Sequence, residues 1–333
     1  MKTMKIAVFS AKSYDRKYFD KCNSSGHFQI TYFDASLSLD TVALTAGFHA
    51  LCLFVNDKVD KEIIIKLAQN GVQIIALRCA GYNNVDIAAA KENNIKLVRV
   101  PAYSPQAIAE HAVALILTLS RKTHKAYNQT REGNFSSEKL IGFNLFNKTV
   151  GVIGTGRIGS AFCSIMMGFG CKVIAFDIIE SATLKETGVT YLPLNEVLQH
   201  ADILSLHCPL TPDTKYMLDN RAFSQMKKGA MVINTSRGAL IKTQDAIEAL
   251  KIGQVGYLGI DVYEQEENFF FKDLSGSIIQ DDVLERLLTF PNVLITPHQG
   301  FLTTEALDQI AAITLQNLAD FRDGLALKNE VTI

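Results

Sequence analysis

The segment Thr149–Asp177 reads TVGVIGTGRIGSAFCSIMMGFGCKVIAFD. A short apolar run leads into a turn that contains Gly154, Gly156 and Gly159, and a helix-like pattern follows this turn. A second apolar run then ends at Asp177. This order predicts a β-strand, a tight turn, a helix and a second β-strand, which together form the beginning of a parallel α/β sheet.

Each glycine of the turn has a predicted role in binding a dinucleotide. Gly154 allows the sharp exit from the strand, Gly156 lets a pyrophosphate approach the backbone, and Gly159 lets the helix lie close to the sheet. Arg157 and Ile158 complete this turn at a helix N-terminus, where free N–H groups and the helix dipole favour negative charge. A glycine triplet also occurs in ordinary tight turns, so the prediction depends on the strand, the helix and the acid around it.

The acid at the end of the second strand predicts which dinucleotide binds. Asp177 is placed to accept hydrogen bonds from both ribose hydroxyls of an adenosine. A 2′-phosphate at this position would meet a carboxylate and be repelled. The sequence therefore predicts NAD rather than NADP as the cofactor.

Length, charge and hydropathy limit the class of protein. The chain has 333 residues, more than most single cores, which favours two domains. The 33 basic and 34 acidic residues nearly balance, so nothing indicates a nucleic acid or an anionic membrane as partner. The N-terminus MKTMKIAVFS resembles no signal peptide, and no apolar run has membrane-spanning length. We therefore expect a soluble, cytoplasmic protein.

The cysteines are scattered singly and lie mostly in apolar segments. They are Cys22, Cys52, Cys79, Cys163, Cys171 and Cys208. This pattern predicts reduced, buried thiols rather than disulfides. No cluster of His, Cys and acidic residues has metal-ligand spacing, so we expect no metal site.

The N-terminal third alternates short β-rich runs with helical patterns, including one at residues 39–46, and predicts a small parallel α/β domain without a phosphate-binding glycine turn. The pattern changes at Pro101. Ser104 is a good N-cap and Pro105 suits the first helical position, so residues 106 to about 131 are predicted to form one long connecting helix.

The predicted strands after Asp177 end in polar or turn-forming clusters. These are His207-Cys208-Pro209, Thr235-Ser236-Arg237-Gly238, Asp261 and Pro297-His298-Gln299-Gly300. Ligands of open parallel sheets bind at the carboxyl ends of the strands, so we expect these clusters to converge on one crevice. A last helix, capped by Thr303 or Thr304 and running to about Asp323, is predicted to cross back to the N-terminal domain.

Three residues near these strand ends suggest the chemistry. A guanidinium binds a carboxylate through two parallel hydrogen bonds, which suits Arg237 to a carboxylate-bearing substrate. An imidazole exchanges a proton near neutral pH, which suits His298 to a carbonyl or carbinol oxygen, and Glu266 would favour the protonated ring. Alternatively, Arg237 is a surface arginine, His298 caps a helix, and Glu266 belongs to a solvated acidic run.

The chain resembles the NAD-dependent D-isomer-specific 2-hydroxyacid dehydrogenases, and most closely the fermentative D-lactate dehydrogenases of bacteria. The resemblance covers essentially the whole chain. It is carried by RCAGYNNVD (78–86), VPAYSPQAIAEHA (100–112), GVIGTGRIG (151–159), LHCPLTPDT (206–214), INTSRGALI (233–241), DVYEQE (261–266) and TPHQGFLT (296–303).

The resemblance implies an α/β fold of two doubly wound parallel-sheet domains with a cleft between them. One would be a flavodoxin-like substrate domain of residues 1–101 and 300–333, and the other a Rossmann NAD-binding domain of residues 102–299. It also implies a homo-oligomer, a dimer or a tetramer, built through the cofactor domains.

The resemblance also implies roles for matching residues. Arg237 would bind the substrate carboxylate, His298 would be the acid/base, and Glu266 would be its partner. The backbone of Cys79, Ala80 and Gly81 would form an anion site for the same carboxylate, and Tyr103 would reach into the substrate pocket. Cofactor contacts are implied for His207, Cys208, Pro209, Thr235, Ser236 and Asp261, with Asp261 facing the nicotinamide carboxamide.

Within the family, the segment ENFFFKDLSGSIIQDD (267–282) resembles that of the D-lactate group. Phe54 and Phe301 would keep the substrate pocket small. The predicted reaction is the NADH-dependent reduction of pyruvate to D-lactate. The alternatives are a broader 2-ketoacid reductase, a phosphoglycerate-type dehydrogenase, or an NADH-responsive corepressor without catalysis.

Overall fold

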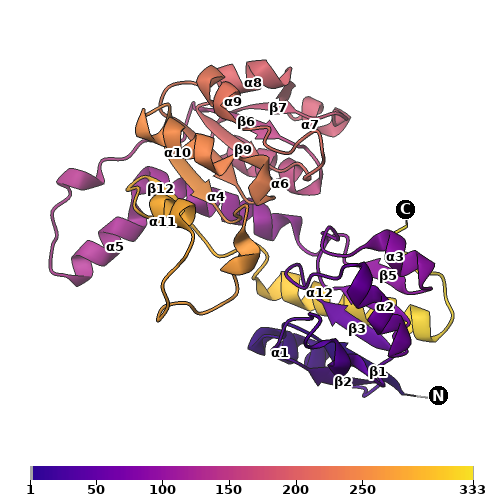
Figure 1. Ribbon diagram of the computed structural model, residues 1–333. Helices are drawn as coiled ribbons and strands as arrows, with labels where there is room; N and C mark the ends of the chain where they lie inside the picture. Colours follow the sequence, from indigo (N-terminus) through magenta and orange to yellow (C-terminus); the bar gives the residue numbers. More distant parts are fainter. Residues whose placement is uncertain (1–2, 333) are drawn as a thin grey trace. The chain divides into compact units, whose positions relative to one another are not determined.

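The structure, a computed structural model, describes residues 3–332 apart from the side chain of Asn268 (Figure 1). The chain divides into two compact units. Unit 1 comprises Met1–Ser104 and Leu302–Ile333, and unit 2 comprises Pro105–Phe301. These divisions lie beside the domain boundaries expected at residues 101 and 300.

Unit 1 is built on a five-stranded parallel sheet with the order β2-β1-β3-β4-β5. This is the strand order of flavodoxin-like folds. The strands are β1 (Met4–Val8), β2 (Phe28–Tyr32), β3 (Ala50–Leu53), β4 (Ile74–Leu77) and β5 (Lys96–Arg99). Every residue of β3 and β4 is buried, as expected for central strands that helices cover on both faces.

Helices cover this sheet. They are α1 (Ser13–Cys22), the 3₁₀ turn η1 (Val42–Thr45), α2 (Lys61–Gln69), α3 (Ile87–Glu92) and α12 (Thr304–Arg322). The last helix, α12, begins after Thr303, whose hydroxyl accepts a hydrogen bond from Ala306 N–H, and it packs against α1, β4 and β5. The helix expected at residues 39–46 is wrong, because this segment forms only the short turn η1.

Unit 2 is built on a seven-stranded parallel sheet with the order β12-β11-β10-β9-β6-β7-β8. The strands are β6 (Thr149–Ile153), β7 (Lys172–Phe176), β8 (Thr190–Tyr191), β9 (Ile203–Leu206), β10 (Ala230–Asn234), β11 (Val255–Ile260) and β12 (Val293–Ile295). The order reverses between β6 and β9, which is the position where Rossmann folds bind dinucleotides. The predicted fold class, two doubly wound parallel α/β domains, is confirmed.

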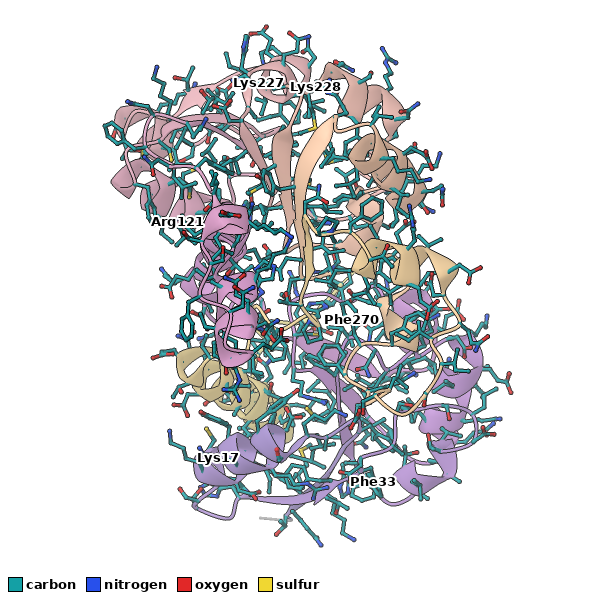
Figure 2. The ribbon with its side chains drawn as sticks, turned by 90° about the vertical axis from the view of Figure 1, so that its left-hand side faces the viewer. Lys17, Phe33, Arg121, Lys227, Lys228 and Phe270 are labelled. Carbon is teal, nitrogen blue, oxygen red and sulfur yellow. The ribbon has the colours of Figure 1, made fainter. Side chains whose placement is uncertain are left out.

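Helices and 3₁₀ turns connect these strands. They are α4 (Pro105–Arg121), α5 (Thr123–Arg131), η2 (Glu138–Leu140), α6 (Arg157–Gly168), α7 (Ala182–Glu186), α8 (Leu194–His200), α9 (Asn220–Gln225), η3 (Gly238–Leu240), α10 (Thr243–Lys251), η4 (Glu266–Asn268) and α11 (Asp282–Leu288). One apolar core lies between one face of the sheet and the helices α4 and α6. A second core lies between the opposite face and the helices α8, α9, α10 and α11. Phe270, labelled in Figure 2, is buried in the second core and anchors the segment after Glu266.

The long helix expected at residues 106–131 is wrong, because the chain forms two helices there. Lys122 has a left-handed backbone with φ of 52° and separates α4 from α5. The carbonyl of Ser120 accepts a hydrogen bond from Phe143 N–H. Gly142 lies so close that a Cβ atom would be 2.0 Å from the same carbonyl oxygen. The returning segment therefore caps α4, and no glycine or proline in the sequence marks this break.

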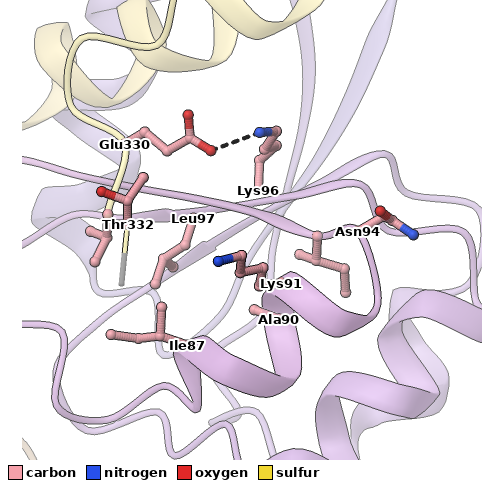
Figure 3. Close-up of a pocket in the computed structure, with 10 residues that line it drawn as sticks. Ile87, Ala90, Lys91, Asn94, Lys96, Leu97, Glu330 and Thr332 are labelled. Carbon is pink, nitrogen blue, oxygen red and sulfur yellow. Dashed lines mark hydrogen bonds and ion pairs between the residues drawn. The ribbon is translucent and has the colours of Figure 1, made fainter.

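A surface pocket of about 370 Å³ lies in unit 1 beside α3, β5 and residues 330–332 (Figure 3). An ion pair of 2.8 Å joins Lys96 to Glu330 at its rim. The predicted site residues are not among those that line it. Within residues 3–332, no helix is long and apolar enough to cross a membrane, and no group of three His, Cys or acidic residues is placed to hold a metal.

Candidate active site

The glycine turn after β6 has the close packing that the sequence predicts. Gly154 has a φ of 91°, and a Cβ atom there would lie 2.6 Å from the Cys208 nitrogen. A Cβ atom on Gly159 would lie 1.9 Å from the Gly154 carbonyl oxygen, so only glycine lets α6 approach the turn. A Cβ atom on Gly156 would meet no described atom within 4 Å. This open side at the N-terminus of α6, formed by Gly156, Arg157 and Ile158, fits a pyrophosphate.

Asp177 follows β7 and is tied to the same turn. Its Oδ2 accepts hydrogen bonds from the N–H (2.5 Å) and the hydroxyl (3.0 Å) of Thr155. Its Oδ1 accepts one from Ile179 N–H at 3.1 Å. The Tyr191 hydroxyl donates to Thr155 Oγ1 at 2.8 Å. Asp177 therefore orders the glycine turn in addition to its predicted contact with the adenosine ribose.

A buried hydroxyl also fits the cofactor. Thr235, at the carboxyl end of β10, is buried, and its Oγ1 has no hydrogen-bond partner among the described residues. Buried polar atoms normally have a hydrogen-bond partner, so a polar group of a bound ligand would complete this site. The adjacent Ser236 hydroxyl donates to the Cys208 carbonyl at 2.6 Å, which joins this loop to the one after β9 that continues into Pro209.

His207 lies in the loop after β9, and its Nε2 is 2.9 Å from the Ser205 hydroxyl. Its ring packs on Phe162 with a centroid distance of 4.8 Å. Burial lowers the pKa of His207 to about 3, because the apolar surroundings disfavour the charged ring. His207 is therefore neutral at physiological pH and suits an uncharged contact with the cofactor.

His298 and Glu266 form a hydrogen-bonded pair. His298 Nδ1 lies 2.8 Å from Glu266 Oε1, and the two side chains are 18% and 22% exposed. The other oxygen, Oε2, accepts a hydrogen bond from Tyr263 N–H at 3.0 Å. His298 has a φ of 56°, in the left-handed region that few residues other than glycine adopt. The pair leaves Nε2 as the imidazole atom for proton exchange.

Arg237 follows β10, and Glu266 comes shortly after β11. These two strands are neighbours in the sheet, so the loops that carry the two residues leave the same edge. Its Nη1 donates to the Ser236 carbonyl at 2.7 Å, and its own carbonyl accepts from Asn234 Nδ2 at 2.8 Å. A Cβ atom on Gly238 would lie 2.1 Å from the Tyr263 carbonyl carbon. The loop of Arg237 is thus packed directly on the loop that leads to Glu266.

Asp261, at the end of β11, uses both carboxylate oxygens within unit 2. Oδ1 accepts hydrogen bonds from the Thr296 hydroxyl and Gln299 N–H, and Oδ2 accepts one from Gly300 N–H. These groups all lie in the loop that carries His298. Asp261 therefore has a structural task in addition to its predicted contact with the nicotinamide carboxamide.

Comparisons with known proteins agree with this geometry. Residues 113–300 match the family described as D-isomer specific 2-hydroxyacid dehydrogenase, NAD binding domain. The chain is 51% identical to a D-lactate dehydrogenase of Escherichia coli (strain K12) over 98% of its length and 100% of the relative's. It belongs to the D-isomer-specific 2-hydroxyacid dehydrogenase family.

Solved structures support the same assignment of this dehydrogenase. The apo-structure of D-lactate dehydrogenase from Escherichia coli has a TM-score of 0.91 at 49% identity, and the match covers 99% of this chain and 100% of that one. The D-lactate dehydrogenase with NAD⁺ from Lactobacillus jensenii has a TM-score of 0.83 at 33% identity, with the same coverage. The predictions of an NAD-dependent enzyme and of NAD as cofactor are confirmed.

The predicted substrate residues of unit 1 follow two adjacent strands of its sheet. Phe54 follows β3, and Cys79, Ala80 and Gly81 follow β4. The Cys79 thiol donates to the Gly81 carbonyl at 3.3 Å, and Arg99 donates to the Ala80 carbonyl at 2.8 Å, so this turn is ordered. Tyr103, also in unit 1, is half-buried before α4, whereas the predicted pocket residue Phe301 belongs to unit 2 and is buried at its end.

Two residues of unit 2 took no part in the predicted site. His111 and Thr296 contact Asp261 and so reach the loop that carries His298. His111 stands in the segment VPAYSPQAIAEHA, which was the only sequence signal for it. Neither spacing nor residue type connects it with Asp261, because the contact depends on the packing of α4 on β11.

The lowered pKa of His207 predicts a pH dependence of stability. Its folded pKa of about 3 lies below the ordinary value of 6.5, so between these pH values the unfolded chain binds more protons than the folded one. This contribution to stability is complete above about pH 6.5 and is lost as pH falls towards 3. It amounts to as much as about 5 kcal/mol.

The measurement is the free energy of urea unfolding between pH 7 and pH 4. His207→Gln should flatten the dependence on pH relative to the unmodified chain, since the amide does not titrate. His200→Gln, at an exposed position on α8, is the matched control and should leave the slope unchanged. Parallel curves for His207→Gln and the unmodified chain would contradict the assignment.

Proposed function

We propose that this dehydrogenase reduces pyruvate to D-lactate with NADH, in a reversible reaction. The observation that carries the proposal is the His298–Glu266 pair at 2.8 Å, which lies at the carboxyl edge of the NAD-binding unit. It provides an oriented imidazole for a carbonyl oxygen. The D-lactate dehydrogenase named among the relatives supports the substrate.

Bound NADH would supply the hydride that the ketone carbon accepts. The chain's own residues would carry out the remaining tasks. His298 would give its proton from Nε2 to the carbonyl oxygen as negative charge develops there, and Glu266 at Nδ1 would stabilise the protonated ring and fix its orientation. Arg237 would bind the pyruvate carboxylate through two parallel hydrogen bonds and stabilise the developing charge.

The other residues predicted to bind substrate keep their roles as part of this proposal. The backbone N–H groups of Cys79, Ala80 and Gly81 would bind the carboxylate, and Tyr103 would border the pocket. Phe54 and Phe301 would limit its size to a small side chain. The proposed division of labour is therefore a substrate-binding unit 1 and an NAD-binding unit 2.

The direct test is the oxidation of NADH, followed by absorbance, with pyruvate, 2-ketoisocaproate or phosphohydroxypyruvate, and a stereospecific assay of the product. We expect fast oxidation with pyruvate and a D-lactate product. Preference for 2-ketoisocaproate would favour a broader 2-ketoacid reductase, and preference for phosphohydroxypyruvate a phosphoglycerate-type enzyme. Tight NADH binding without oxidation would favour a non-catalytic corepressor.

Glu266→Gln tests the partner of the acid/base. The change removes the negative charge beside His298 and so disfavours the protonated ring that donates to pyruvate. The alkaline fall in kcat/KM for pyruvate reduction should move to lower pH. Glu285→Gln, an exposed change on α11, is the matched control. A profile identical to that of the unmodified enzyme would remove Glu266 from the mechanism.

We also propose that the enzyme self-associates in the cytoplasm, where fermentative pyruvate reduction would take place. The support is a set of apolar side chains on and after α5 that are 61% to 80% exposed: Tyr127, Phe135, Ile141 and Phe146. No residue of α5 is buried. Exposed apolar groups in such numbers are typical of interfaces. Sedimentation velocity should show a dimer or tetramer, and a monomer at all concentrations would contradict the proposal.

A further inference from the structure

The loop that carries His298 is held at several points by one buried carboxylate. Asp261 is 1% exposed. Its Oδ1 lies 2.5 Å from the Thr296 hydroxyl and 2.9 Å from Gln299 N–H, and its Oδ2 lies 2.8 Å from Gly300 N–H. These contacts come before and after His298 in the chain, so Asp261 fixes the loop on both sides of the proposed acid/base.

His111 joins the same cluster from another element. It stands on α4, which packs against β10, β11 and β12. Its Nε2 lies 3.0 Å from Thr296 Oγ1 and 3.3 Å from Asp261 Oδ1. The His111 side chain is 14% exposed, so these contacts are largely shielded from water. His111 thereby connects a long helix to the loop of His298.

The hydrogen bonds of the cluster have a definite direction. Burial alone would raise the pKa of Asp261, but hydrogen bonds from His111 and Thr296 hold it below its ordinary value. The carboxylate is therefore ionised at neutral pH and accepts only. The Thr296 hydroxyl must then donate to Asp261, which leaves its lone pairs for His111. His111 consequently carries a hydrogen on Nε2 and donates it to Thr296 and Asp261.

Gly300 shows how closely the loop fits this cluster. A Cβ atom at this position would lie 3.0 Å from Asp261 Oδ2 and 3.4 Å from His111 Cδ2. The first distance is shorter than side chains normally tolerate, so the loop lies directly against both residues. A side chain at position 300 would therefore press on the Asp261 carboxylate, and glycine leaves room for the hydrogen bond from Gly300 N–H to Asp261 Oδ2.

We propose that His111 is a positioning residue for the reaction, acting through Thr296 and Asp261 to hold His298 in place. This inference rests on the proposed role of His298 as acid/base. His111 itself contacts neither substrate nor reacting atoms in this proposal. The Nε2–H of His111 donates to Thr296 and Asp261 and fixes their positions. These two residues in turn hold the loop so that His298 stays hydrogen-bonded to Glu266.

The expected effect follows from the sensitivity of catalysis to geometry. A displacement of about 1 Å at a reacting group costs on the order of 100-fold in rate. His111→Phe keeps a ring in the space but removes the donor. We expect kcat for pyruvate reduction to fall by about 10- to 100-fold, with the dissociation constant of NADH within about twofold of the unmodified enzyme.

A rescue experiment separates the donor from mere packing. His111→Gln places an amide N–H near the position of Nε2 and should restore kcat to within about threefold of the unmodified enzyme. The alkaline fall in rate should also move to lower pH in His111→Phe, since a displaced loop weakens the bond between His298 and Glu266. His200→Phe, at an exposed position, is the control for the added ring.

Thr296 provides a second, independent pair of variants. Thr296→Val removes the hydroxyl at nearly constant shape and should give the same loss of kcat, whereas Thr296→Ser should retain activity. The double variant His111→Phe/Thr296→Val should be no worse than the poorer single variant, because both changes break one chain of hydrogen bonds. If His111→Phe fails to fold, the Thr296 pair still decides the question.

Several outcomes would overturn the proposal. A normal kcat in both His111→Phe and Thr296→Val would do so, as would a loss confined to NADH affinity, which would assign the cluster to the cofactor. Failure of His111→Gln to restore kcat would assign His111 to packing alone. His298→Asn measured in parallel distinguishes the proposals: if it is fully active, the proposed function fails, and if only the His111 and Thr296 variants are normal, this inference alone fails.

Discussion

His298→Asn is expected to lower kcat for pyruvate reduction by about 1,000-fold or more, because His298 has the one side chain of residues 296–300 that exchanges a proton near neutral pH. This loss of kcat should exceed the one expected for His111→Phe. Asparagine keeps a polar side chain of similar reach but exchanges no proton near neutral pH. The measurement is the steady-state rate of NADH oxidation at saturating pyruvate, together with fluorescence titration of NADH.

The affinity for NADH should change little, since the glycine turn and Asp177 are untouched. His200→Asn, an exposed change on α8, is the matched control for loss of one imidazole. A kcat within a few-fold of the unmodified enzyme would remove His298 from the mechanism. A matching loss in NADH affinity would instead indicate that the residue supports the cofactor site.

Arg237→Lys should raise the KM for pyruvate by about 100-fold. Lysine keeps the positive charge but replaces the planar fork with a single ammonium group, so one of the two parallel hydrogen bonds to the carboxylate is lost. A charged hydrogen bond contributes about 1.5–3 kcal/mol, which corresponds to roughly 10- to 150-fold in affinity. Initial rates over a wide range of pyruvate concentrations measure this effect.

The dissociation constant of NADH separates a substrate contact from a general disturbance of the loop. It should be unchanged in Arg237→Lys, since Thr235 and Ser236 keep their backbone. Arg221→Lys, at an exposed position on α9, is the matched control. A near-normal KM for pyruvate in Arg237→Lys would overturn the carboxylate assignment.

Some parts of the candidate site could be predicted because they depend on local sequence. The turn requires glycine at positions 154 and 159, where a side chain would collide with nearby backbone. These positions are close together in the sequence, so the glycine spacing is enough to predict the turn. Arg237 and His298 were found through a topological rule, since the carboxyl ends of parallel strands share one edge. These predictions required no knowledge of which distant side chains touch.

Other features could not be predicted because they depend on contacts between distant segments. The break at Lys122 arises where the segment around Gly142 and Phe143 packs over the end of α4. Phe143 N–H donates a hydrogen bond to the Ser120 carbonyl there. Helical periodicity continues across this point, so it indicates one helix. The pairing of Asp177 with Thr155 is likewise invisible in the pattern that assigns Asp177 to a ribose.

The sequence by itself determined the parallel α/β class and the NAD cofactor and led to the proposal of the catalytic residues, because periodicity, glycine spacing and strand-end chemistry act over short stretches. The tertiary structure alone decided which side chains hold these residues in place. His111 meets Asp261 only because α4 packs on the sheet beside β11, and Gly238 meets Tyr263 only because two loops cross at one edge. Such contacts follow from the packing of whole elements, and no local pattern of residues encodes them.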